Sequence, residues 1–272
     1  MSAGLNGLLQ ARYGTGPAPE ASLEAPEALA LLLKHRSVRK FTDAPVTEEQ
    51  LTAIIAAAQS APSSSNHQAY SIIEVRDPER RRRLADLGRG SRFIPEAPVI
   101  LLFVADWVRH RALAAAAGEP HEADQYFEST LVGAIDAALA AQNAVVAASA
   151  LGLGSCFLGS LRNEPDFMAE EYELPAGAVI LFGLAIGWPD PSERAGIKPR
   201  LPQHLVRHRE HYTPASAAEI AAYDEALAAY YRAYDRPHSW TSVAIDRVRG
   251  ILGLHGRETM REAFGRRGLP SH

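Results

Sequence analysis

The sequence contains a single cysteine, Cys156, so the chain can form no intramolecular disulfide bond. We therefore expect a protein of a reducing compartment, the cytoplasm. No apolar run reaches the roughly 18 residues that a membrane-spanning helix needs, and the N-terminus lacks the pattern of a signal peptide. The net charge is −4, which disfavours general nucleic-acid binding. We expect neither a membrane nor a nucleic-acid partner.

Several common motifs of nucleotide and nucleophile chemistry are also missing. Gly152 and Gly154 follow a predicted helix and lack the third glycine of a dinucleotide-binding fingerprint. Neither a P-loop nor a G-x-S-x-G nucleophile elbow occurs. His204, His208 and His211 have the spacing of metal ligands, but the arginines between them would oppose a metal ion, so we expect no metal site.

The rest of the chain has ordinary globular composition, with 47% hydrophobic and 22% charged residues. Apolar runs predict strands, and helical apolar spacing between capping signals predicts helices. Strands are expected at 70–77, 98–106, 155–161 and 178–189, and helices at 25–34, 47–61, 77–88, 129–151, 216–235 and between 242 and 264. Because strict βαβ alternation is absent, we expect an α+β fold with helices on both faces of one sheet.

Three short clusters carry side chains suited to ligand chemistry. Residues 35–39 (HRSVR) hold two guanidiniums, an imidazole and a hydroxyl, a set that suits a phosphate monoester. Residues 63–68 (SSSNHQ) supply short donors and acceptors for a polyol chain or a heterocycle edge. Residues 198–200 (KPR) present two cations on a stiff loop. Together they indicate a phosphorylated cofactor, and the alternative for each is an ordinary surface segment.

The motifs HRSVRKF, P-S-S-S-N-x-Q, GLG-x-x-F-L-G-S-L-R-N, FGLAIGWP and KPRLP occur in this order. In order and spacing they resemble the nitroreductase superfamily, in particular the branch of oxygen-insensitive NADPH nitroreductase (group A) and flavin reductase P. The resemblance covers about residues 28–245. It implies a nitroreductase-like α+β fold, with a mixed, mostly antiparallel sheet flanked by helices, in an intertwined homodimer. It also implies tightly but non-covalently bound FMN at the subunit interface.

The resemblance divides the chain into three parts. Residues 1–24 are expected to be a flexible N-terminal extension, and residues 25–215 an FMN-binding nitroreductase-like core. Residues 216–272 are expected to form a C-terminal helical arm that packs on the core or on the partner subunit.

The resemblance also implies the residues of the site. Those expected to bind FMN are His35, Arg36, Ser37, Arg39, Ser63, Ser64, Ser65, Gln68, Leu158, Gly159, Ser160, Leu161, Lys198 and Arg200, with the serine cluster reaching in from the partner subunit. Lys198 and Arg200 are the catalytic candidates, because a cation near the flavin's pyrimidine end stabilises its reduced, anionic form. Candidates for contact with NADPH or substrate are Arg39, Ser91, Arg162, Arg232 and Arg236.

Two positions depart from the pattern of that branch. Ser91 stands where a G-G-Q segment often supplies glutamine, a difference that bears on the acceptor. Arg236 stands alone where the branch carries paired arginines, a difference that bears on the choice of NADPH or NADH.

The resulting hypothesis is an FMN-dependent enzyme that takes hydride from NADPH, with NADH as an alternative donor. It would pass the hydride on, by ping-pong kinetics, to nitroaromatics, quinones or similar electrophiles. Three alternatives stay open: a flavin reductase that supplies reduced FMN to a partner, a non-catalytic flavin-binding protein, and a nucleic-acid binder built on Arg80–Arg83. The net charge of −4 disfavours the last of these.

Overall fold

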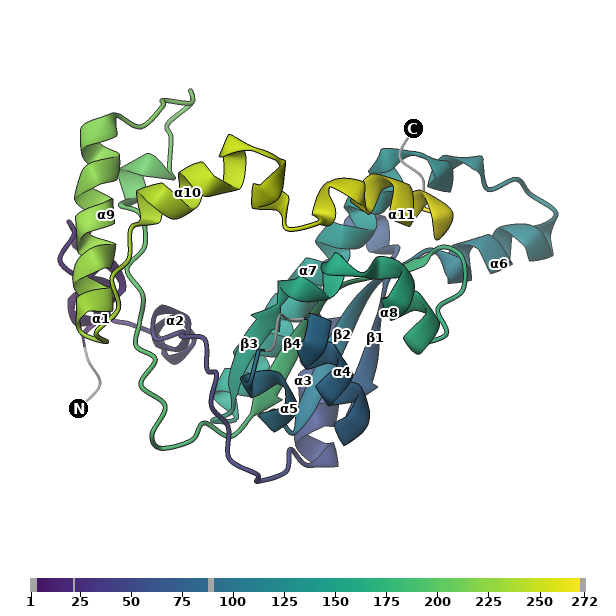
Figure 1. Cartoon of the computed structure of the whole chain (residues 1–272), viewed down its shortest axis with the longest axis horizontal. Helices are drawn as coiled ribbons and strands as arrows, with labels where there is room; N and C mark the ends of the chain where they lie inside the picture. The colour runs from purple at the N-terminus through teal and green to yellow at the C-terminus, as the bar shows by residue number, and fades with distance from the viewer. Residues whose placement is uncertain (1–3, 22, 88–90, 270–272) are drawn as a thin grey trace. The chain divides into compact units, whose positions relative to one another are not determined.

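A computed structural model describes residues 4–21, 23–87 and 91–269 (Figure 1). The chain forms two compact units. The first contains the described residues up to Arg36 together with Arg194–Leu254. The second contains the described residues of Ser37–Glu193 and those from His255 onward.

The second unit is built on a sheet with the strand order β1-β2-β4-β3. The strands are β1 (Tyr70–Val75), β2 (Val99–Asp106), β3 (Gly154–Leu158) and β4 (Ala178–Gly187), and they lie where the apolar runs predicted them. The strand pairs of the described residues are antiparallel, and an isolated bridge between Ser37 and Ser155 is parallel. The sheet and the helices on it confirm the expected α+β class and the mostly antiparallel strand pairing.

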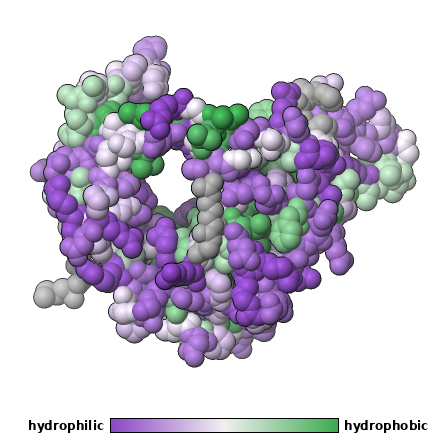
Figure 2. All heavy atoms as spheres, viewed as in Figure 1, coloured by the Kyte–Doolittle hydropathy of each residue, from purple (hydrophilic) through white to green (hydrophobic). Residues whose placement is uncertain are grey.

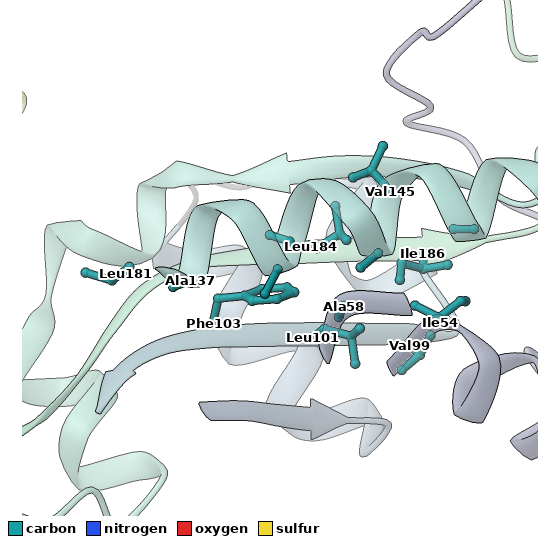
Figure 3. Packing of buried hydrophobic residues seen from close by; sticks show 14 of the residues in the cluster. Ile54, Ala58, Val99, Leu101, Phe103, Ala137, Val145, Leu181, Leu184 and Ile186 are labelled. Atoms are coloured by element: carbon teal, nitrogen blue, oxygen red, sulfur yellow. The ribbon is translucent and has the colours of Figure 1, made fainter. Parts of the chain in front are cut away.

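Helices cover both faces of the sheet, which is why every residue of β2 is buried. On one face, α3 (Glu48–Gln59) and α7 (Phe127–Ala150) pack on side chains such as Phe103 and Leu184 (Figure 3). On the other face lie α4 (Pro78–Leu87), α5 (Phe93–Glu96) and α8 (Pro165–Glu171), against a second core cluster that includes Ile100 and Leu102. Alternate residues of one strand thus serve two cores.

Local sequence signals place two of these helices. Thr47 caps α3, and the side chain of Gln50 reaches back to the amide of Thr47, so the predicted capping box is present. The helix α4 begins at Pro78, as proline at a first turn predicts. Its arginine run is paired within the fold: Arg82 bonds Glu79, and Arg80 and Arg83 reach Glu171.

The helix α7 is long and apolar enough to cross a membrane by composition alone. Half of its most apolar stretch is buried inside the protein, where Ala137, Ala141 and Ala144 let it approach the sheet closely. It is therefore the central core helix of this unit. The outer surface on the face seen in Figure 2 is mostly hydrophilic, with apolar areas between the polar ones.

A bulge in β4 changes which side chains face α7. The register against β2 shifts between Phe103 and Val104, so that Phe103 faces Phe182 while Val104 faces Ile180. The extra residue, Leu181, then lies on the same face as Phe182, and both contact the core on the α7 side. The bulge thereby places Leu181 and Phe182 in the wall of a cavity next to α7.

The rest of the second unit consists of α6 (Val108–Ala117) and α11 (Met260–Arg266). One helix was expected between residues 242 and 264, but the structure has α10 (Trp240–Arg249) and α11 separated by short 3₁₀ turns. The glycines of this stretch explain the break: Gly250 is fully extended, and Gly256 has a φ of 88°, outside the helical region.

The first unit contains α1 (Leu5–Tyr13), α2 (Glu27–Leu33), α9 (Ala217–Arg232) and α10. The helix α9 opens with the capping box of Ser216 and Glu219. The helix α1 lies in the segment expected to be a loose extension. Its Leu5, Leu8 and Leu9 are buried, because the spacing L-x-x-L-L places them on one helical face.

Candidate functional site

In the second unit, the segment Ser37–Arg39 runs beside the start of β3. Ser37 forms the parallel bridge with Ser155, and the amide of Val38 donates to the carbonyl of Ser155 at 2.9 Å. The amide of Arg39 donates to Glu193 Oε2 at 2.7 Å, while its side chain is exposed. The first cluster therefore has a fixed backbone from which the Arg39 guanidinium extends into solvent.

The loop Ser63–Gln68 carries the second cluster, and its backbone is strained. Ser65, Asn66 and Gln68 have φ angles of 46°, 59° and 53°, a region that residues other than glycine seldom adopt. Such strain persists only where the surroundings hold it, and it concentrates at functional sites. The side chains of residues 64–68 are exposed. The loop thus presents polar groups outward from a backbone that is held in place.

Asp136 of α7 is one of the groups that hold this loop. Its side chain is almost fully buried, and its carboxylate accepts the amides of Ser64 at 2.9 Å and Ala69 at 3.1 Å. Arg109 adds bonds to the carbonyls of Gln68 and Tyr70, at 2.9 and 2.7 Å. Sequence reasoning missed Asp136, although a carboxylate in the middle of an apolar helix was a visible signal, since buried carboxylates need partners.

The end of β3 supplies the backbone groups predicted from the resemblance. Leu158 and Leu161 are buried, so only their backbone could face a ligand, whereas Gly159 and Ser160 are partly exposed in a 3₁₀ turn. The guanidinium of Arg162 follows directly and donates to the carbonyl of Leu181 at 2.6 Å. This bond fixes the position of Arg162 beside the β4 bulge.

Arg162 also lines a cavity of about 740 Å³ within the second unit. The walls are mostly apolar and come from α7, the β4 bulge and the C-terminal segment; they include Phe127, Phe182 and Phe264, with Arg261 as a second cation. Flat aromatic molecules with a negative substituent match such a lining.

In the first unit, two cation-bearing loops that are about 160 residues apart in sequence lie side by side. Arg12 of α1 joins them: its guanidinium donates to the carbonyls of Leu33 and His35, at 2.6 and 2.7 Å, and to that of Lys198 at 3.3 Å. The guanidinium of Arg36 donates to the carbonyl of Ala195 at 3.1 Å. The structure thus brings the predicted residues 35–36 and 198–200 together.

The pKa shifts within this cluster indicate a positive electrostatic potential. Burial lowers the pKa of His35, and the charges of Arg12 and Arg200 lower it further. Burial and the charge of Arg200 likewise lower the pKa of Arg12. Cations gathered at this density disfavour one another unless an anion joins them. The cluster has the charge pattern of an anion-binding site.

Aromatic residues of α9 hold the loop that carries Lys198. The Tyr230 hydroxyl donates to the carbonyl of Gly196 at 3.2 Å and accepts its amide at 3.1 Å. Burial and a hydrogen bond with Tyr234 raise the pKa of Tyr230 to about 12, so the hydroxyl keeps its proton at neutral pH. The Lys198 ammonium lies 5.4 Å from the centre of the Tyr231 ring, within range of a cation–π contact.

The remaining predicted residues lie in less enclosed places. Arg232 pairs with Glu225 at 2.7 Å on an exposed part of α9, and Arg236 is exposed just beyond its end. Ser91 precedes α5, and its carbonyl accepts the amide of Ile94 at 3.1 Å. The glycines next to it, expected near the flavin, fall at 88–90, outside the described residues.

Comparison with known proteins identifies the family of the chain. The chain matches the Nitroreductase family over residues 32–188 and the Nitroreductase family, C-terminal domain, over residues 198–272. It is 44% identical over 207 residues to FMN reductase [NAD(P)H] of Bacillus subtilis, covering 75% of this chain and 82% of the relative. It is 41% identical over 203 residues to oxygen-insensitive NADPH nitroreductase of Salmonella typhimurium, covering 75% and 82%.

Solved structures give the same result. B. megaterium NfrA2 superposes with a TM-score of 0.85 at 34% identity, covering 91% of this chain and 99% of the other. NADPH:FMN oxidoreductase from Vibrio harveyi, complexed with NAD+, superposes with a TM-score of 0.80 at 33% identity, covering 91% and 100%. The fold and the matched regions define an α+β protein of the nitroreductase type. The chain belongs to the nitroreductase family.

Proposed function

We propose that this chain is an FMN-dependent NAD(P)H oxidoreductase of the cytoplasm. The observation that carries the proposal is the cation cluster of the first unit, where His35, Arg36, Lys198 and Arg200 gather around loops fixed by hydrogen bonds. Relatives named FMN reductase and oxygen-insensitive NADPH nitroreductase support the choice of cofactor and donor.

The donor set fits FMN group by group. A phosphate dianion suits forked guanidiniums and an imidazole. Burial is the main reason that the pKa of His35 is lowered, and the phosphate charge would offset the further lowering by Arg12 and Arg200. The polar Ser63–Gln68 loop suits the ribityl chain or the ring edge, and the backbone of Leu158–Leu161 suits the ring. Tight, non-covalent binding follows from charge-assisted bonds without any linking residue.

Bound FMN would supply the hydride chemistry, accepting a hydride from a nicotinamide and giving it to an electron-poor acceptor. The protein residues then bind, orient and stabilise charge. Lys198 and Arg200 are the catalytic candidates, because preorganised cations stabilise negative charge that develops during the reaction. The hydride donor and the electron acceptor would bind one after the other at the same site, which gives ping-pong kinetics.

The site is proposed to work in a homodimer formed through α7. Large apolar side chains recur every four residues on this helix and stay exposed: Phe127, Leu131, Ile135 and Leu139. A stripe of this kind favours contact with a second copy of the helix. The same helix holds the Ser63–Gln68 loop through Asp136, so a partner contact at α7 would also place that loop.

NADPH is the proposed donor, with NADH as an alternative, and nitroaromatics, quinones and similar flat electrophiles are the proposed acceptors. Arg162 is the best-placed cation for the donor or acceptor, since it is fixed by the Leu181 carbonyl at the edge of the apolar cavity. The exposed Arg39, Arg232 and Arg236 are the other candidates for the donor's phosphate.

A flavin reductase that releases reduced FMN to a partner is the second candidate, because relatives carry the names FMN reductase and NADPH-flavin oxidoreductase. The two functions differ in how FMN behaves during turnover. If FMN stays bound, added free FMN acts only as another acceptor. If it leaves, reduced FMN accumulates in solution as a product.

The direct test compares the affinity of the apoprotein for FMN and riboflavin, which differ only in the phosphate. We expect FMN to bind more tightly, and Arg36→Ala and Arg39→Ala each to reduce that difference. One charge-assisted bond contributes roughly 1.5–3 kcal/mol, or about 10- to 150-fold in the dissociation constant. Arg82→Ala, an exposed arginine paired with Glu79, is the control. Unchanged FMN affinity in both Arg36→Ala and Arg39→Ala would contradict the assignment of these residues to the FMN phosphate.

A further inference from the structure

We propose that Arg12, in the segment before the family match, is a positioning residue of the cofactor site. The inference rests on the proposed function, since it concerns how the same site is assembled. The family match begins at residue 32, so the α1 helix lies outside the matched region. Its single buried cation contacts both of the loops that carry the predicted phosphate ligands.

The contacts of Arg12 are directed at backbone rather than at side chains. Nε and Nη2 donate to the carbonyl of Leu33 at 3.1 and 2.6 Å, and Nη2 also donates to that of His35 at 2.7 Å. Nη1 donates to the carbonyl of Lys198 at 3.3 Å. The amide of Arg200 closes the set by donating to the carbonyl of Arg12 at 3.1 Å. One residue thus fixes the path of the chain through both loops.

The helix that carries Arg12 is itself anchored. Leu5, Leu8 and Leu9 are buried on the same helical face as Arg12, which is only 7% exposed. Just beyond the helix, Gly14 has a φ of 63° and lies so close to Pro199 that a Cβ there would approach its ring at 2.8 Å. The end of α1 is therefore fitted against the Lys198–Arg200 loop.

This arrangement accounts for a buried arginine that pairs with no carboxylate of the described residues. A guanidinium in a buried, cationic environment is costly, and both burial and Arg200 lower the pKa of Arg12. Its forked donors satisfy the carbonyls of two loops at once, which a lysine cannot do with the same geometry. Loops that are already ordered lose less conformational entropy when they bind an anion.

The experiment uses the full chain with Arg12→Gln and Arg12→Lys, and measures FMN affinity, riboflavin affinity and the urea stability of the apoprotein. We expect Arg12→Gln to weaken FMN binding about tenfold or more, with a smaller effect on riboflavin. Arg12→Lys should recover only part of that loss, because it restores the charge but not the fork.

Arg81→Gln is the matched control, because the Arg81 guanidinium also bonds backbone carbonyls, those of Pro95 and Ala97, far from the loops in sequence. It should lower the stability of the apoprotein without changing the ratio of FMN to riboflavin affinity. An Arg12→Gln protein with the wild-type ratio would overturn the proposal. Full recovery in Arg12→Lys would also overturn it, since charge alone would then suffice.

The outcome is separable from that of the proposed function. A wild-type protein that binds neither FMN nor riboflavin would contradict the proposed function itself. A wild-type protein that binds FMN, with Arg12 variants that bind it equally well, would contradict only the positioning role of Arg12.

Discussion

Lys198 is the residue on which the catalytic assignment depends most. Its carbonyl accepts a bond from Arg12, and its ammonium lies over the Tyr231 ring, so both ends of the residue are held. A cation held in advance stabilises developing negative charge without a reorganisation cost. Its contribution should therefore be larger in the reaction than in binding of the oxidised cofactor.

We expect Lys198→Ala to slow the reduction of bound FMN by NADPH by roughly 10- to 100-fold, the scale of a lost preorganised donor. FMN affinity should change less. Stopped-flow bleaching of the flavin absorbance measures the rate, and fluorescence titration measures the affinity. Lys34→Ala, an exposed lysine just after α2, is the control. A wild-type reduction rate in Lys198→Ala would take this residue off the catalytic list.

His35 gives the site a pH dependence whose sign follows from its surroundings. Burial, Arg12 and Arg200 lower its pKa in the folded protein below the ordinary 6.5. As the pH falls through 6.5, the unfolded chain takes up the proton first, so the folded apoprotein loses stability. The loss is complete once the pH lies below the folded pKa.

Urea unfolding of the apoprotein between pH 8 and pH 5 measures this effect. We expect the free energy of unfolding of the wild type to fall below about pH 6.5 more steeply than that of His35→Gln. The other histidines contribute equally to the pH dependence of both proteins, so their contributions cancel in the comparison. They include His110, whose pKa is also lowered by burial and by His67 and Arg109. Parallel pH profiles for the two proteins would show that His35 is not the group responsible.

At the scale of elements, the Ser37–Arg39 segment depends on its fit against β3. A Cβ at Gly154 would lie 2.6–2.9 Å from three side-chain carbons of Val38, which is itself almost fully buried. Val38 therefore could not move without moving the backbone that bonds to Ser155. Only glycine at position 154 allows the first cluster its present path.

We expect Gly154→Ala to destabilise the protein by about 1–3 kcal/mol, as overpacking does, and to weaken FMN binding as well. Gly177→Ala is the control, because Gly177 has a φ of 96° and lies against the Arg111 guanidinium. This variant should be less stable than the wild type but should keep its FMN affinity. Unfolding curves and FMN titrations of both variants provide the measurement. An equal loss of FMN affinity in both would point to general destabilisation rather than to Val38.

The elements that sequence predicted well are those with local signals. The β-branched residues gave β1, the continuous apolar run gave β2, and the capping residue Thr47 gave the start of α3. The helix α1 was missed, because the Gly, Pro and Ser content around it hid a short L-x-x-L-L face. Its order comes from tertiary burial, which no local rule contains.

The candidate site was predictable to a similar extent. The HRSVR and KPR clusters are visible as charges, and the resemblance to a family assigned them to one ligand. The supporting contacts were not predictable, because the partners of Arg12 and Asp136 are backbone groups distant in sequence. Such pairings depend on the tertiary fold. Sequence patterns therefore reveal the residues that contact a bound molecule more readily than the residues that position them.

At the scale of the whole molecule, the account requires a homodimer. The exposed stripe of α7 and the Asp136 bonds to the Ser63–Gln68 loop lie on one helix, so the interface and the cofactor loop should respond together. Ile135 lies in this stripe and is 48% exposed. A charge at its position would be buried unpaired in the proposed interface, which costs several kcal/mol.

We therefore expect Ile135→Glu to elute as a monomer in size-exclusion chromatography with light scattering, and to lose most of its FMN. Leu113→Glu, which changes an exposed leucine of α6, should remain a dimer with FMN bound. If Ile135→Glu stayed dimeric with full FMN occupancy, the interface would have to lie elsewhere on the chain.

The central claim, that this protein carries FMN and exchanges hydride with a nicotinamide, is tested most directly by visible absorption. The spectrum of the purified protein is recorded without oxygen, before and after the addition of NADPH and, separately, NADH. We expect oxidised-flavin bands at about 370 and 450 nm that bleach on addition of the donor, faster with NADPH. A colourless protein that takes up no added FMN, or a flavin that neither donor bleaches, would contradict it.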